Sequence, residues 1–353
     1  WSYINYLQQT FYILCFNVSY PRTVKAFLSG FSAGRFDFLP NFNDIFGSGF
    51  PEIRALPTFY TYGLSGLYFQ TIGGILMILW IALMVFGLLR LLYKYLENKE
   101  KVTIILRNYF STSTWVCMWK GFYLELLVAG FLQMRKVNFD KPFYSIQVVI
   151  AILVTMMSLS FSVGIYKLVK QMIEEKVQLR FRALIRDYNY EHPKARYFIL
   201  VYLGRRSLMA IALVFFYDSP YLQVFSCLLL SASYLYLLFK YNPYHNRFMN
   251  KIEKIREGAH IALYPSILIL AAKTGDNSFS FATKEAIGSA IVITAAAALI
   301  VESILLTKKE IEKLRILWPE LKTLFNIKKA PKRVLTKGQR RIRIDEILKV
   351  NLQ

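Results

Sequence analysis

The chain of 353 residues is 55% apolar and 16% aromatic, with a formal net charge of +22 and a positive mean hydropathy. Its long apolar runs exclude an ordinary soluble domain. Lys and Arg lie between these runs and in the C-terminal tail, so the basic charge indicates membrane topology and not a nucleic-acid partner. Three cysteines at irregular spacing indicate neither a disulfide framework nor a thiolate metal site.

Helix-length apolar runs predict an all-α fold, a polytopic transmembrane bundle of about eight spans. A helix needs about 20 residues to cross the hydrocarbon core of a bilayer. In chain order the expected spans are 2–20, 62–92, 114–134, 144–169, 197–217, 221–241, 259–272 and 286–306. The first is diluted by Asn and Gln, so an interfacial helix remains an alternative to a span there.

The runs 197–217 and 221–241 are separated only by Asp218, Ser219 and Pro220. Such a short connection predicts a hairpin of two antiparallel helices, with Pro220 in the first turn of the second. The predicted cytoplasmic segments hold 32 of the 44 Lys and Arg residues, and the outer segments hold 9. By the positive-inside rule the hairpin turn lies outside.

Two segments outside the spans have patterns of their own. The outer loop 22–61 is rich in Phe, Gly and Pro and predicts a folded loop with a short helix at 23–31. It is either a cap on the headgroup zone or a binding site. The cytoplasmic segment 167–196 predicts an amphipathic continuation of the preceding span. We therefore expect a transmembrane domain over 1–306 and a basic cytoplasmic region over 307–353.

The C-terminal region predicts an interfacial amphipathic helix followed by a basic tail that binds anionic lipid. A protein or nucleic-acid partner is the weaker alternative for this tail. Its expected lipid-facing residues are Lys328, Lys329, Lys332, Arg333, Arg340, Arg341 and Arg343.

No enzyme signature is present: the chain has no Walker loop, no G-x-S-x-G and no H-E-x-x-H. The three histidines, His192, His245 and His260, lie on three different segments. We expect neither an enzyme nor a cofactor, and no metal site.

Ionisable residues within the expected spans are the default functional candidates, because a charge in lipid requires a partner or water. Lys120 and Glu125 lie about 140° apart round a helix, so each is expected to find a partner on another helix. Arg205 and Arg206 lie about two turns into their span, and Glu302 lies near the end of the last one.

Two interpretations of these charges remain open. Either they pair within the bundle or reach the headgroups, or some of them line an ion or substrate path. The path residues would be Glu125, Arg206, Gln223 and Asp276. An arginine at every third position is absent, which argues against a voltage sensor.

One order of motifs resembles the TRP-like membrane domain of polycystin-like proteins, flavin carriers and large protist surface proteins with Cys-rich ectodomains. It comprises Arg206, an apolar run, Pro220-x-x-Gln223, a second apolar run, Asn242-Pro243-Tyr244, Asn250 and Glu257. Pro21 and the Phe-rich loop with Leu39-Pro40 are similar too. The resemblance covers residues 6–306.

The resemblance implies a multi-pass protein related to TRP channels, with cation permeation, in a plasma or ciliary membrane. One feature departs from a tetrameric channel: the connection 273–283 is too short for a pore helix and a filter. The alternative function is a non-conducting anchor for an extracellular or ciliary-surface assembly. The chain begins at Trp1 without Met, so we expect an upstream region, and membrane or extracellular subunits as partners besides the lipid bilayer.

Overall fold

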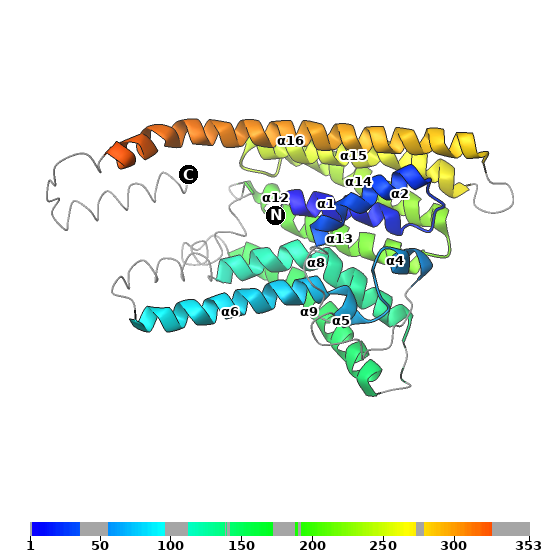
Figure 1. Ribbon diagram of the computed structural model, residues 1–353, viewed down its shortest axis with the longest axis horizontal. Helices are drawn as coiled ribbons and strands as arrows, with labels where there is room; N and C mark the ends of the chain where they lie inside the picture. The colour runs from blue at the N-terminus through cyan, green and yellow to red at the C-terminus, as the bar shows by residue number, and fades with distance from the viewer. Residues whose placement is uncertain are drawn as a thin grey trace. The chain divides into compact units, whose positions relative to one another are not determined.

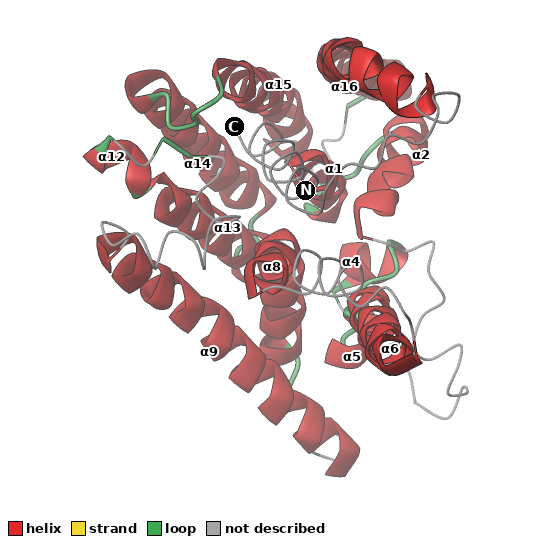
Figure 2. Ribbon diagram, turned by 90° about the vertical axis from the view of Figure 1, so that its left-hand side faces the viewer, coloured by secondary structure: helices red, strands yellow, loops and turns green. Residues whose placement is uncertain are grey.

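A computed structural model describes residues 2–35, 56–95, 112–137, 139, 142–171, 188–189, 192–272 and 279–326 of the chain. All regular elements in these ranges are helical, which confirms the all-α prediction (Figures 1 and 2). Two compact units divide the chain, Trp1–Ile300 and Val301–Gln353. Residues 172–187 of the predicted amphipathic segment, Asp276 and all seven predicted lipid-facing residues of the tail lie outside the described residues.

The helices carry the labels of Figure 1, with α for α-helices and η for short 3-10 helices. They are α1 (Ser2–Tyr12), η1 (Ile13–Cys15), α2 (Arg22–Ser29), η2 (Gly30–Arg35), α4 (Pro57–Thr61), α5 (Tyr68–Thr71), α6 (Gly73–Tyr95), α8 (Thr112–Arg135), α9 (Pro142–Gln171), α12 (Pro193–Arg196), α13 (Phe198–Phe215), α14 (Pro220–Tyr241), α15 (Arg247–Ala272) and α16 (Phe281–Asn326).

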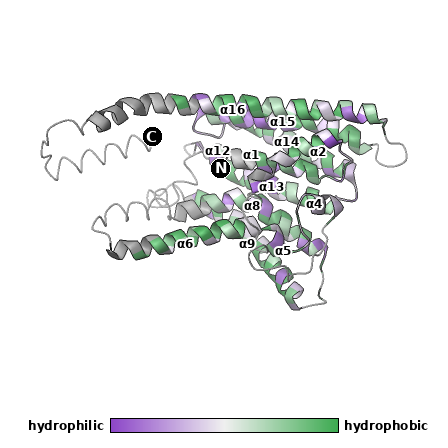
Figure 3. Ribbon diagram, in the orientation of Figure 1, coloured by the Kyte–Doolittle hydropathy of each residue, from purple (hydrophilic) through white to green (hydrophobic). Residues whose placement is uncertain are grey.

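Four helices in the described part are long and apolar enough to cross a membrane, as the green ribbons of Figure 3 indicate. They are Pro142–Lys170, Lys194–Phe215, Pro220–Tyr241 and Phe281–Lys308. A fifth apolar segment, Gly73–Leu88, is shorter. These helices indicate an integral membrane protein, but the predicted number of about eight spans is not confirmed.

The first expected span is not one continuous helix. α1 ends at Tyr12, η1 ends at Cys15, and Phe16 is extended. The Asn17 N–H donates to Gln223 Oε1 at 3.0 Å, and its side-chain amide donates to the Tyr217 carbonyl at 3.2 Å. The backbone therefore leaves the helix where these polar contacts form, and the helical part is shorter than a bilayer requires.

The predicted hairpin is confirmed as α13 and α14. Pro220 stands in the first turn of α14, where its missing N–H costs no helical hydrogen bond. Arg135 of α8 contacts both ends of this turn. Its guanidinium donates a hydrogen bond to the Val214 carbonyl and forms an ion pair with Asp218 at 2.5 Å. The Gln223 side-chain amide donates to the Leu213 carbonyl at 2.6 Å and so joins the two helices of the hairpin.

The connection from α14 to α15 explains the Asn242-Pro243-Tyr244 motif. Asn242 ends α14 in the left-handed conformation with φ 41°, which Asn tolerates better than most residues. Asn250 accepts a hydrogen bond from the Tyr244 N–H at 3.1 Å and donates to its carbonyl at 2.7 Å. Burial raises the pKa of the Tyr244 phenol well above its ordinary value, so this side chain stays neutral. Tyr188 stacks on the same ring.

Other local predictions have mixed outcomes. The short helix expected at 23–31 is confirmed by α2 and η2. The expected span 62–92 is broken: the short helix α5 precedes α6, and Gly63 turns the chain with φ +78°. The span expected at 259–272 is the second half of a longer helix, α15, whose first half carries charges. α16 continues unbroken beyond 306 to Asn326.

We predict that Gln223→Met lowers the thermal stability of the detergent-solubilised protein by about 1–2 kcal/mol, because two backbone groups lose a buried partner. Differential scanning fluorimetry measures the change. Ser233→Ala, on the exposed side of the same helix, is the control and should change nothing. Equal melting points for Gln223→Met and wild type would contradict the structural role.

Candidate functional site

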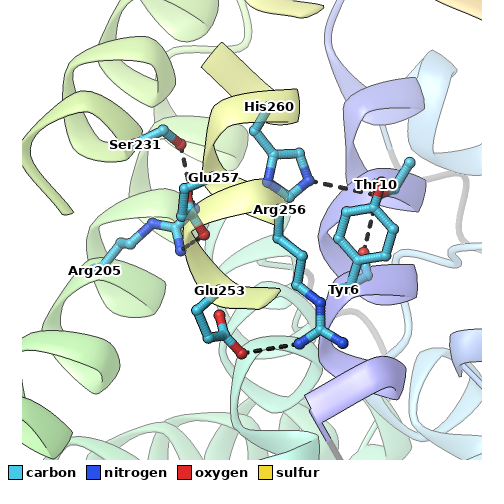
Figure 4. A network of polar contacts seen from close by, with 8 residues as sticks. All are labelled: Tyr6, Thr10, Arg205, Ser231, Glu253, Arg256, Glu257 and His260. Carbon is cyan, nitrogen blue, oxygen red and sulfur yellow. Dashed lines mark hydrogen bonds and ion pairs between the residues drawn. The ribbon is translucent and has the colours of Figure 1, made fainter. Parts of the chain in front are cut away.

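Four polar residues share one face of α15 and form the centre of a buried polar cluster. Glu253, Arg256, Glu257 and His260 follow one another at spacings of three, one and three residues, which places them on one side of the helix (Figure 4). Figure 4 shows Arg205 and Ser231 on one side of α15 and α1 on the other. Hence α15 supplies charges to two neighbouring surfaces.

The contact with α13 is a buried ion pair. Arg205 Nη1 lies 2.6 Å from Glu257 Oε1, and Arg205 Nη2 donates to the Ser231 hydroxyl of α14 at 3.2 Å. The guanidinium also lies 4.6 Å from the centre of the Tyr234 ring. Arg205 is 6% exposed and Glu257 1%, so neither charge reaches solvent. The pair therefore satisfies two charges that water would otherwise have to solvate.

The contact with α1 is made by Arg256 and His260. Arg256 pairs with Glu253 at 2.8 Å and lies 5.6 Å from the Tyr6 ring. His260 Nε2 lies 3.4 Å from the Thr10 hydroxyl, which donates its only proton to the Tyr6 carbonyl at 2.9 Å. The hydroxyl can then only accept, so Nε2 carries the proton in this contact.

The cluster surrounds a small pocket with room for about one water molecule. Its lining residues are Tyr6, Gln9, Tyr202, Arg205, Glu253, Arg256 and Glu257. Two buried acceptors of the cluster, Glu257 Oε2 and His260 Nδ1, have no hydrogen-bond partner within the described ranges. A proton donor or a cation is the chemistry that would satisfy them.

A second buried ion pair joins α8 to the outer loop. Arg35 Nε of η2 lies 3.1 Å from Glu125 Oε1, and both side chains are 2% exposed. Arg35 also donates to the Tyr62 carbonyl at 3.3 Å and lies over the Phe11 ring. The expectation that Glu125 finds a partner outside its own helix is confirmed, although the partner lies in a segment that the sequence analysis treated as a loop.

The remaining predicted site residues have different surroundings. Gln223 forms hydrogen bonds with the Asn17 N–H and the Leu213 carbonyl. Arg206 is fully buried over the Tyr202 ring, and Lys120 is partly buried over the rings of Tyr188 and Tyr202.

Glu302 is buried, and Asp276 lies outside the described residues. Arg206 contacts the Lys120 carbonyl, whereas Glu125 and Gln223 have partners of their own. The predicted path through Glu125, Arg206, Gln223 and Asp276 stays a prediction.

None of the cluster's residues on α15 is among the predicted site residues, although Glu257 belongs to the motif order that resembles the TRP-like domain. The signal was present: Glu253, Glu257 and His260 recur at spacings of four and three residues, which is typical of one helix face. The expected span 259–272 starts after Glu257 and so leaves the first half of α15 outside it. Tyr6 and Thr10 carry no signal of this kind, because their roles arise only when α1 packs against α15.

In comparisons with known proteins, no protein-family model, curated protein or solved structure matches this chain. The site is therefore interpreted from its own contacts and charges.

We predict that Arg205→Met destabilises the protein by about 3–5 kcal/mol, because it leaves the Glu257 charge buried without its cation. Adding Glu257→Met should restore most of the loss, since an apolar pair leaves no charge to solvate. Thermal unfolding of the single and double variants measures the coupling.

Asp218→Asn is the matched control for the ion pair, because Asp218 is largely exposed and its pair with Arg135 should contribute less than about 1 kcal/mol. A double variant no more stable than Arg205→Met alone would contradict the buried-pair interpretation.

Glu125→Gln should lower the melting temperature, because the Arg35 guanidinium loses a charged acceptor in a buried position. Glu285→Gln, which changes an exposed carboxylate bonded to Thr23, should leave it close to the wild-type value. An unchanged melting temperature in Glu125→Gln would count against burial of this pair.

Proposed function

We propose that the protein moves a small cation or proton across a membrane, as a channel or carrier, and that the cluster centred on Glu257 takes part in the path. The observation that carries the proposal is the set of unsatisfied acceptors on α15. Glu257 Oε2 and His260 Nδ1 face a helix bundle in which the described residues give them no donor. A cation or a proton would supply what both atoms lack.

Energetics supports a role beyond packing. Moving a charged side chain from water into a protein interior costs several kcal/mol per ion. An apolar pair of similar volume often stabilises a protein as well as a buried ion pair does. Stability alone therefore does not explain why charged residues stand at positions 205 and 257. Intramembrane carboxylates and histidines are typical of ion and proton routes.

The charges of the cluster suggest how such a route would be controlled. Arg205 and Arg256 offset Glu257 and Glu253, so the four groups carry no net charge. A cation must therefore compete with an arginine for each carboxylate, and the pocket holds only about one water. We propose that this arrangement is the closed state, and that opening separates α13 from α15.

The proposal keeps the transport class that the TRP-like resemblance implies, and with it a plasma or ciliary membrane. The proposed path differs from the one predicted from the sequence, because it passes through the cluster on α15. Glu125 pairs with Arg35, and Gln223 bonds to backbone atoms, so both side chains already have partners. Membrane or extracellular subunits, the lipid bilayer and anionic lipids at the tail remain the proposed partners.

A non-conducting anchor is the second candidate, and one observation favours it. In the described part of the chain, three carboxylates pair with a buried arginine: Glu125 with Arg35, Glu257 with Arg205, and Glu253 with Arg256. A bundle that only holds an assembly in place would pair its charges in this way.

The test is an ion-flux assay on the purified chain reconstituted in liposomes. We predict cation or proton flux in the wild type and its loss in Glu257→Gln, which keeps the shape but removes the charge. Glu285→Gln is the matched control, because it removes an exposed carboxylate. Melting temperature and protease accessibility confirm that each variant is folded and inserted.

Two further variants locate the route. Flux lost in Glu125→Gln or Asp276→Ala but kept in Glu257→Gln would place the path where the sequence analysis predicted it and refute the cluster. No flux from folded, inserted wild-type protein would favour the anchor.

A further inference from the structure

A second polar site lies between α8 and α13, which are neighbours in the bundle (Figure 2). Arg206 is 0% exposed, and its guanidinium carbon lies 4.7 Å from the centre of the Tyr202 ring. The Lys120 ammonium lies 5.2 Å from the same ring centre and 5.1 Å from that of Tyr188. Two cationic groups therefore share one tyrosine ring.

Neither cation has an acidic partner in the described part of the chain. Among the described residues, Arg206 makes one long hydrogen bond, 3.5 Å from Nη1 to the Lys120 carbonyl, and its Nε and Nη2 have no partner there. The Tyr202 hydroxyl, buried beside them, also has no partner among the described residues. The unsatisfied atoms of Arg206 and Tyr202 are donors or can donate, and no described carboxylate pairs with either cation.

Arg205, the preceding residue on α13, shows what a compensated arginine looks like in this bundle. It has a carboxylate at 2.6 Å, a hydroxyl at 3.2 Å and an aromatic ring. Within the described ranges, Arg206 contacts a ring and, at long range, a carbonyl, and no carboxylate. A fully buried guanidinium without an anion is costly, so this site lacks a negatively charged partner.

The charges around the site agree with this interpretation. The carboxylate of Glu253, which lines a pocket with Tyr202, already pairs with Arg256 at 2.8 Å. Lys120 is partly buried as a whole residue, whereas Arg206 is fully buried. Both residues belong to the half of the bundle that the charge distribution assigns to the cytoplasm.

We propose that Lys120, Arg206 and Tyr202 bind a phosphate group. Phosphate offers several oxygen acceptors, the guanidinium binds it through two parallel N–H groups, and lysine adds a point charge. The group comes either from the headgroup of an anionic lipid in the cytoplasmic leaflet or from a free phosphate ion. The proposal is independent of the transport function and holds equally for an anchor.

The test is thermal stabilisation of the full chain in detergent, at constant ionic strength. The probes are short-chain phosphatidic acid, inorganic phosphate and, as the uncharged reference, short-chain phosphatidylcholine. We expect phosphatidic acid or phosphate to raise the melting temperature of the wild type in a saturable manner. In Lys120→Gln the half-saturating concentration should rise about tenfold or more, as expected on loss of one charge-assisted hydrogen bond.

Lys240→Gln is the matched control. Lys240 also lies over tyrosine rings, those of Tyr236 and Tyr241, but it is exposed and remote from Arg206 along the chain. Its removal should leave the half-saturating concentration unchanged. The basic tail is the same in all variants, so a difference between Lys120→Gln and Lys240→Gln cannot come from lipid bound to the tail.

Each outcome decides the proposal. A response to inorganic phosphate that Lys120→Gln weakens identifies a free-anion site, and a response to phosphatidic acid alone that Lys120→Gln weakens identifies a lipid headgroup. No response, or the same response in wild type and Lys120→Gln, would overturn the proposal. Arg206→Lys, which keeps the charge but loses the paired N–H groups, should weaken binding while the chain remains folded.

Discussion

The bundle depends on one constraint: charges that enter its interior must be offset there, because lipid and packed side chains solvate them poorly. α15 brings two carboxylates and an arginine into that interior, and no lipid-facing helix could carry them. Arg205 and Ser231 satisfy one side of α15, and Tyr6 and Thr10 contact the other. The positions of α1, α13 and α14 around α15 follow from these contacts as much as from apolar packing.

This constraint also explains why α1 is short. A full span over residues 2–20 would place its polar residues along a continuous helix, whereas the observed break at Phe16 lets Asn17 bind Gln223 and the Tyr217 carbonyl. α1 is long enough for the Thr10 hydroxyl to contact His260 of α15. The first segment therefore completes the polar interior, and its length is set by those contacts and not by the thickness of the bilayer.

Local signals in the sequence were sufficient for the hairpin and insufficient for the cluster. The hairpin of α13 and α14 could be predicted because two apolar runs and a three-residue turn with Pro220 lie next to one another in the chain. The partner of Glu125 could not be named, because Arg35 is 90 residues away in a loop of irregular composition. Three of the predicted path residues, Glu125, Arg206 and Gln223, lie in expected spans, yet Gln223 binds backbone atoms of Asn17 and Leu213. Spacing on α15 would have identified Glu257, but only packing reveals that it meets Arg205.

Adjacent residues on α13 connect the two polar sites. Arg205 and Arg206 lie about 100° apart round the helix, so one faces α15 while the other faces α8. A rotation or shift of α13 that separates Arg205 from Glu257 must also move Arg206 relative to Lys120. An anion bound between Arg206 and Lys120 would oppose that movement, because it ties α13 to α8. By linkage, opening of the Arg205–Glu257 pair would in turn weaken anion binding, so the two sites would influence each other through one rigid helix.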